Sequence, residues 1–180
     1  TSVNPDSYDT PSTSAHEGTH LINGLLSITY EGGPRYQGLY LGDGKYVVLR
    51  DPDILVGNVD NILPDGFKTG RYYLYVAPYK GSGEPFDRIL EESIAYTKGA
   101  EVAVEMANAR KWTSGPQDAV QGAIEFVPHN LALGMAVKNG DSRYWNSPEG
   151  AKFRWFLRFQ LERQMNVFNK GIKNNNFCFL

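Results

Sequence analysis

The sequence is poor in cysteine, in basic surplus and in long apolar runs, and each shortage excludes a class of protein. One cysteine, Cys178, among 180 residues cannot form a disulfide within the chain. No apolar run approaches the roughly 20 residues that a transmembrane helix needs. Lys and Arg number 18 against 20 Asp and Glu, so the net charge is −2, without the basic surplus typical of nucleic-acid-binding proteins. We therefore expect neither a membrane span nor nucleic acid as a partner.

Size and composition predict one domain over residues 1–180. Hydrophobic residues make up 41% of the chain and charged residues 21%, which is ordinary for a folded protein of this length. The chain opens Thr1-Ser2-Val3, without an initiator Met or a signal peptide. Many Asn, Gly and Tyr with modest Lys are typical of exported bacterial proteins, so we expect a secreted or periplasmic protein.

Histidine is also scarce, and two of its three copies stand in one motif. His16-Glu17-Gly18-Thr19-His20 spells H-E-x-x-H. On a helix, positions i and i+4 share a face, so His16 and His20 can bind one metal ion together. Glu17 stands beside them, within reach of a water at that metal. The pattern is typical of two zinc ligands and a general base for metal-assisted hydrolysis.

The residues around the motif predict a helix. Thr10 is a good N-cap residue and Pro11 fits the first helical position, so we expect a helix over 12–26. The β-branched residues in 28–30 predict extended chain after it. Glu17 is the only formal charge between residues 10 and 30, and this favours a buried active-site helix over a solvated surface helix.

Zinc held by two His needs at least one more protein ligand. A third His six residues after the motif would mark a metzincin, but Leu26 stands there. Further along, Glu92-Ser93-Ile94-Ala95 spells E-x-x-A. H-E-x-x-H followed by E-x-x-A resembles the gluzincin branch of zinc metallopeptidases, in which a helical Glu completes a His-His-Glu site.

This resemblance covers two short segments and implies both a ligand set and a fold. It implies that Zn²⁺ is held by His16, His20 and Glu92, with Glu91 as the rival third ligand one residue round the helix. It also implies an α+β, zincin-like fold: a small sheet packed with the H-E-x-x-H helix, the Glu-ligand helix and further C-terminal helices. Only fifteen residues precede His16, so the sheet must come from the segment between the two helices, or from sequence missing at the front.

The segment between the motifs predicts this sheet. Strands over 36–41 and 45–50 flank Gly42-Asp43-Gly44, a strong hairpin signal. Residues 51–70 predict a long loop with a short helical piece. The segment 71–77, rich in Tyr, predicts a third strand. Its tyrosines are expected to pack the sheet, the alternative being that they line a cleft. If this strand lies at the edge of the sheet, it can accept an extended peptide by β-addition.

The remaining sequence predicts helices. Pro85 begins the helix that carries Glu92 and runs to about Arg110, and its small residues Gly99, Ala100 and Ala103 allow close approach of the motif helix. In the last third of the chain, a helix is predicted from Ser114 and Pro116 toward Val127; Pro128 breaks or kinks it, and an apolar stretch over 131–137 continues it. A long helix with a broad aromatic face is predicted over 147–169, with a stop at Gly171. In the tail, Phe177, Phe179 and Leu180 are expected to dock onto the body of the protein.

Two further residues are candidates for the site. Tyr96 stands one turn after Glu92. Its phenol either polarises a substrate carbonyl or forms a hydrogen bond with one of the side chains that hold the metal. His129 follows Pro128, where it stabilises an oxyanion, replaces a zinc ligand or serves a structural role.

The sequence as a whole predicts a zinc-dependent hydrolase, specifically a metallopeptidase that acts on a peptide or protein substrate. Glu17 takes a proton from the attacking water and passes it to the leaving nitrogen, and zinc with Tyr96 stabilises the oxyanion. The alternative is a non-catalytic zincin-like binding module with a structural or vestigial metal site. A scaffold has no need of Glu17, so the complete motif favours the enzyme.

Overall fold

The computed structural model describes residues 11–29, 35–83, 85–112 and 118–177, and they form a mainly helical α+β architecture. The elements are α1 (Pro11–Thr29), β1 (Tyr36–Gly42), β2 (Lys45–Arg50), α2 (Val56–Asp60), the 3-10 helix η2 (Asp65–Phe67), α3 (Tyr72–Tyr75), α4 (Asp87–Asn108), α5 (Ala119–Gly140), α6 (Ser142–Trp145) and α7 (Pro148–Gly171). The expected combination of a small sheet, two motif helices and C-terminal helices is confirmed. None of the described helices is long and apolar enough to cross a membrane.

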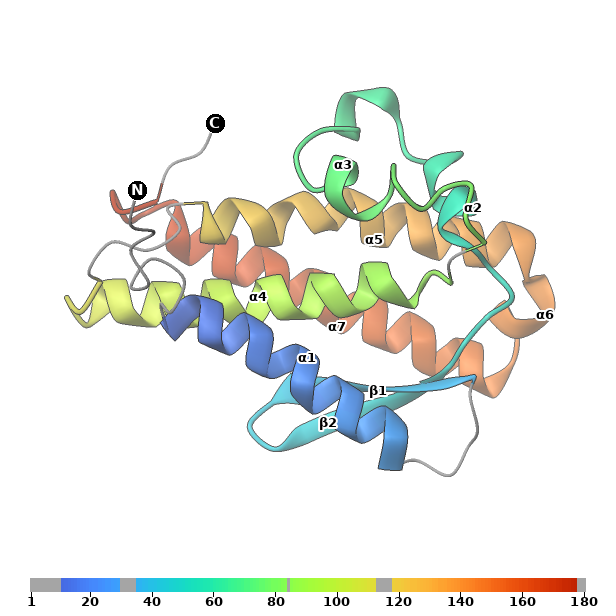
Figure 1. The fold of residues 1–180 in the computed structure, drawn as a ribbon, viewed down its shortest axis with the longest axis horizontal. Coiled ribbons are helices and arrows are strands. Elements are labelled where there is room, and N and C mark those ends of the chain that lie inside the picture. The colour runs from blue at the N-terminus through green and yellow to red at the C-terminus, as the bar shows by residue number, and fades with distance from the viewer. Residues whose placement is uncertain (1–10, 30–34, 84, 113–117, 178–180) are drawn as a thin grey trace, which may run out of the picture.

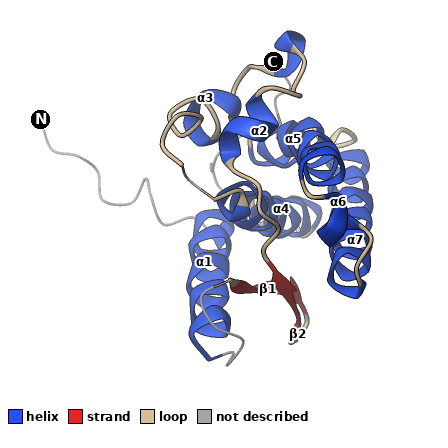
Figure 2. Ribbon diagram, turned by 90° about the vertical axis from the view of Figure 1, so that its right-hand side faces the viewer, coloured by secondary structure: helices blue, strands red, loops and turns tan. Residues whose placement is uncertain are grey.

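Helix α4 occupies the centre of the molecule. It lies between α1 on one side and the pair α5 and α7 on the other (Figure 2). The hairpin of β1 and β2 lies beneath α4, and the segment carrying α2 and α3 lies across its opposite side (Figure 1). Helix α1 packs against both α4 and β1. This arrangement places the two motif helices side by side.

The predicted hairpin is confirmed as an antiparallel, two-stranded sheet. Its register pairs Tyr36 with Arg50 and Leu39 with Val47. The backbone takes positive φ at Gly42 (102°), Asp43 (52°) and Gly44 (72°), a conformation that glycine tolerates best, and for this reason the glycines mark the turn.

The prediction of a third strand over 71–77 is wrong, because these residues form the short helix α3 and an irregular turn. Their backbone bonds locally: the Tyr75 N–H donates to the Arg71 carbonyl at 2.9 Å. The tyrosine hydroxyls bond outward, with Tyr72 donating to Asp60 at 2.7 Å. Side-chain contacts to α2 and α4 therefore outweigh the β-propensity of aromatic residues. No strand edge exists here for a peptide to extend.

Two helix boundaries also differ from expectation. Helix α1 continues to Thr29 where extended chain was predicted, and the Ser27 and Thr29 hydroxyls bond carbonyls one turn earlier. Helix α5 runs through Pro128 without a break. Proline removes one hydrogen bond, but the fully buried Phe126 and Leu133 hold both halves in the core. The predicted start at Ser114 and Pro116 lies outside the described residues.

The C-terminal half of the molecule supplies most of the core. Helix α7 begins at its predicted cap, where the Ser147 hydroxyl accepts a hydrogen bond from the Gly150 N–H at 3.1 Å. Of its aromatic face, Phe153 and Phe156 are fully buried, whereas Trp155 is half exposed. The predicted docking of Phe177 is confirmed by its burial against Trp112, while residues 178–180 lie outside the described part of the chain.

Candidate metal centre

Helix α1 presents both motif histidines to α4. His16 and His20 lie one turn apart, and their Nε2 atoms are 3.1 Å from each other. Their side chains are 16% and 24% exposed, so the two rings are largely shielded from bulk water. The predicted helical spacing therefore produces a pair of nitrogens that face the same point.

Glu92 on α4 supplies the third atom of this group. Its Oε2 lies 3.7 Å from Nε2 of His16 and 3.6 Å from Nε2 of His20. The three potential ligand atoms all lie within 4.8 Å of one another. Oε2 is also buried and has no hydrogen-bond partner among the described residues. A buried carboxylate oxygen without a donor is costly unless a cation balances it, so the donor set fits a metal ion.

Glu91 occupies a different position. Its Oε1 lies 3.2 Å from Nδ1 of His20, on the side of the ring opposite the Nε2 pair. A carboxylate that accepts a hydrogen bond from Nδ1–H holds the tautomer whose Nε2 lone pair is free for a metal. The structure therefore brings Glu92 to the ligand group and Glu91 behind it.

The two imidazoles differ in their electrostatics. The hydrogen bond that His20 donates to the Glu91 carboxylate, together with the neighbouring charge of Glu92, raises the pKa of His20 to about 10. Burial, followed by the neighbouring charge of His20, lowers the pKa of His16. Without a metal the positive charge of the pair thus lies on His20, and a divalent ion competes with the added proton of that ring for the site.

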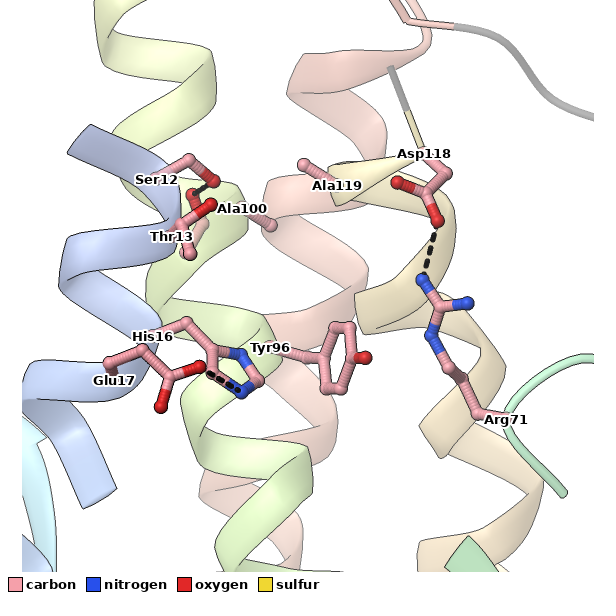
Figure 3. Close-up of a pocket in the computed structure, with 10 residues that line it drawn as sticks. Ser12, Thr13, His16, Glu17, Arg71, Tyr96, Ala100, Asp118 and Ala119 are labelled. Carbon is pink, nitrogen blue, oxygen red and sulfur yellow. Dashed lines mark hydrogen bonds and ion pairs between the residues drawn. The ribbon is translucent and has the colours of Figure 1, made fainter. Parts of the chain in front are cut away.

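Glu17 lies beside this group without belonging to it. Its Oε1 is 3.9 Å from Nε2 of His16, and its side chain is 69% exposed. Figure 3 shows the carboxylate turned toward the His16 ring at the mouth of the site. This is a suitable place for a base that contacts a bound water and substrate, because the carboxylate is reachable from solvent.

Tyr96 forms one wall of the site together with two residues that the sequence argument missed. Its ring packs edge-on against His16 at 4.6 Å between centroids, and its hydroxyl is 3.0 Å from the hydroxyl of Tyr75. The guanidinium of Arg71 lies over its other side, 4.7 Å from the ring centroid. Burial, the bond to Tyr96 and the charge of Glu92 raise the pKa of Tyr75, which keeps it a neutral donor. The tyrosine cluster at 72–75 was the available signal, but it was assigned to a sheet.

A cavity of about 330 Å³ opens beside His16. Its lining comes from α1, α4, the start of α5 and Arg71 (Figure 3): Ser12, Thr13, His16, Glu17, Arg71, Tyr96, Gly99, Ala100, Asp118 and Ala119. On the α5 side of this cavity, Arg71 donates a hydrogen bond to Asp118 at 2.6 Å. The Ser12 hydroxyl donates to the Gly99 carbonyl at 2.9 Å, so the small residues of α4 do permit close approach of α1.

His129 does not join the site. It is 1% exposed on α5, with its ring edge-on to Phe126, and it is not part of the ligand group. Burial lowers its pKa to about 4, and neither ring nitrogen has a hydrogen-bond partner among the described residues. Of the roles considered from the sequence, the structure supports only a buried, neutral side chain.

Comparison with known proteins finds no family model that matches the chain, and no significant match among the curated proteins or the solved structures. Only the motif and the geometry of the site therefore point to a function.

Proposed function

We propose that this protein is a zinc-dependent hydrolase, specifically a metallopeptidase of the zincin-like, gluzincin type. The observation that carries the proposal is the convergence of His16, His20 and Glu92 within 4.8 Å, with the Glu17 carboxylate 3.9 Å from one of them. A catalytic zinc site takes three protein ligands, whereas a structural site takes four. Among the described residues, the group that can hold a metal has three members, and this favours catalysis over a non-catalytic module.

In this proposal His16, His20 and Glu92 would hold the ion, and Glu91 orients His20 from behind. Zinc, when bound, supplies a Lewis acid that polarises a carbonyl and lowers the pKa of a water. Glu17 takes the proton of the attacking water and passes it to the leaving nitrogen. Tyr75 donates its hydroxyl to that of Tyr96, which leaves the Tyr96 O–H to donate to the oxygen on which negative charge develops.

Metal content tests the ligand assignment. After removal of metal and reconstitution with zinc, native mass spectrometry should find one zinc per wild-type chain and none in His16→Ala/His20→Ala. Glu92→Ala should lose most bound zinc, because it removes a ligand. Glu91→Ala is the matched control, and it should keep zinc with a loss of affinity of about 10–100-fold, as expected when the residue that orients a ligand is removed.

Three outcomes contradict this assignment. Equal zinc content in wild type and the double His variant would show that His16 and His20 do not bind the zinc. Loss in Glu91→Ala with retention in Glu92→Ala moves the third ligand by one residue. Loss in neither single variant shows that some other side chain completes the site.

A further inference from the structure

Helix α1 is amphipathic, but its polar side faces the protein interior and its apolar side faces solvent. Its buried side is polar: Ser12, Thr19 and Asn23 are each at most 4% exposed. Its solvent side is apolar, and three residues there form what we call the α1 stripe: Leu21 (67% exposed), Leu25 (55%) and Ile28 (82%). A surface helix normally turns its apolar side inward. The α1 stripe is therefore an exposed apolar surface of the kind that marks interaction sites.

Hydrogen bonds hold α1 in this orientation. Asn23 Oδ1 accepts from the Tyr40 N–H at 2.7 Å, and Ser27 Oγ accepts from the Gly38 N–H at 2.9 Å. Both bonds satisfy backbone groups on the outer edge of β1. Rotation of α1 to bury its leucines would break these bonds and carry the histidines away from α4. The exposure of the stripe follows from the architecture of the site.

The α1 stripe begins at the candidate catalytic base. Glu17, Leu21, Leu25 and Ile28 are spaced four, four and three residues apart, so they share one side of the helix. At 100° per residue, Glu17 lies about 60° from His20, between the ligand face and the stripe. From Glu17 to Ile28 the helix rises about 16 Å, a length that an extended polypeptide covers with about five residues.

We propose that the α1 stripe binds apolar side chains of a polypeptide substrate on one side of the bond to be cleaved. This proposal rests on the proposed function of the metal centre, because the stripe is continuous with Glu17. It names the substrate class: an extended polypeptide with Leu, Ile, Val or Phe within about five residues of the scissile bond. A bound substrate would cover the α1 stripe, which is exposed to solvent in the described fold.

Charge argues against two other occupants. Helices that lie on membranes carry Lys or Arg on their polar face, but α1 has neither, and Glu17 and Glu91 stand at its exposed end. A symmetric pair of chains with their α1 helices parallel would bring two Glu17 carboxylates together, and an antiparallel pair would instead set the partner's apolar Ile28 end against each Glu17 carboxylate. Polypeptide is the occupant that meets neither obstacle.

The test compares Leu25→Glu with Leu131→Glu, because these leucines are 55% and 52% exposed. Leu131 lies on α5, outside the ligand group and the cavity beside His16. Zinc content and thermal unfolding are measured first. Both variants should match wild type, since exposed substitutions away from special features change stability little.

The probe is a randomised pool of decapeptides, digested by zinc-loaded protein and read by mass spectrometry. Wild type and Leu131→Glu should enrich apolar residues on one side of the cut. Leu25→Glu should lower that enrichment about tenfold, the effect of losing one buried apolar contact. Equal enrichment in Leu25→Glu and wild type overturns the proposal, and so does an equal loss in both variants.

A second arm does not depend on hydrolysis. Zinc-loaded Glu17→Gln protein is mixed with the same pool, and the peptides that co-elute on gel filtration are sequenced. Apolar peptides should be retained, and retention should fall when Leu25→Glu is added. Such retention without any cleavage by wild type supports the stripe as a polypeptide site and contradicts the proposed hydrolase. Retention without apolar bias overturns the stripe, whatever the activity.

The two rival occupants have their own measurements. Co-sedimentation with vesicles of phosphatidylcholine and phosphatidylglycerol, and sedimentation velocity of the protein alone, are run on wild type and Leu25→Glu. We expect no vesicle binding and no dimer that depends on Leu25. Vesicle binding lost in Leu25→Glu assigns the stripe to a lipid surface, and a dimer that the substitution dissociates assigns it to a second copy; either result overturns the proposal.

Discussion

Glu17 is the residue whose chemistry separates an enzyme from a metal-bearing scaffold. Its carboxylate faces the ligand group but is not one of the three ligand atoms. Glu17→Gln keeps the shape and removes the charge, so zinc content and stability should stay at wild-type values. Hydrolysis should fall by about 10²–10⁴-fold, the usual contribution of a general base. The measurement is the rate on any peptide that wild type cleaves, with zinc content determined on the same sample.

Full activity in Glu17→Gln would show that the mechanism is wrong even if the metal site is right. Loss of zinc in Glu17→Gln would instead make Glu17 a ligand. Glu91→Gln is a suitable control, because it alters a neighbouring carboxylate that lies behind His20.

At the scale of single residues, the structure also shows which of several candidate side chains lie at the site. Glu91 and Glu92 differ by about 100° around α4, and only the position of α1 decides which of them meets both histidines. Tyr96 was expected near the site, and it lies there. Tyr75, its hydrogen-bonded partner, was missed because its contact with Tyr96 spans 21 positions of chain.

At the scale of elements, the geometry of the candidate metal centre depends on how closely α1 approaches α4. Gly99 makes this possible: a Cβ added there would lie 3.0 Å from the Ser12 carbonyl oxygen and 3.5 Å from Cβ of His16. Gly99→Val should therefore push the helices apart. We expect a loss of about 1–3 kcal/mol in the free energy of unfolding, the usual cost of overpacking. Zinc affinity should fall as well, because His16 and Glu92 stand on opposite sides of the widened contact.

Gly24→Val is the matched control for this prediction. Gly24 is also helical, but nothing lies within 4 Å of its added Cβ. Chemical denaturation and zinc titration of both variants should show the loss only in Gly99→Val. Equal behaviour of the two variants would mean that helix propensity, rather than contact between α1 and α4, determines the result.

For the whole molecule, His129 should make stability depend on pH. Burial lowers its pKa in the folded state to about 4, below the ordinary value of 6.5, so the unfolded chain binds the proton more readily. Its contribution to stability is complete above pH 6.5 and is lost as the pH falls toward 4. Between pH 7 and pH 5 this amounts to about 2 kcal/mol in the free energy of unfolding.

His129→Phe removes this titration and the unpartnered ring nitrogens while keeping an aromatic ring beside Phe126. Urea unfolding at pH 7 and pH 5 should show a smaller loss in the variant than in wild type. His129→Leu is a second variant without the titrating ring, for use if the larger Phe ring does not fit the buried position and the Phe variant fails to fold. Parallel losses in wild type and both variants would show that other groups cause the acid sensitivity.

The sequence by itself determined the features whose causes lie within a few residues. The spacing of H-E-x-x-H places two histidines on one face of any helix, and Gly42-Asp43-Gly44 turns the chain between two strands. Ser147 before Pro148 begins α7 at its predicted residue. Each of these depends on backbone geometry and on neighbours up to one turn away, so no knowledge of the rest of the chain is needed.

Only the tertiary structure decided the features that depend on distant contacts. Residues 71–77 have strand-like composition, yet the bonds of Tyr72 to Asp60 and of Tyr75 to Tyr96 make them helical and bring them to the site. The polar side of α1 faces inward because β1 and α4 offer it hydrogen-bond partners, so its leucines face solvent. The physical reason is one of magnitude: local propensities differ by at most about 1 kcal/mol per residue, and a few buried contacts between distant segments exceed that.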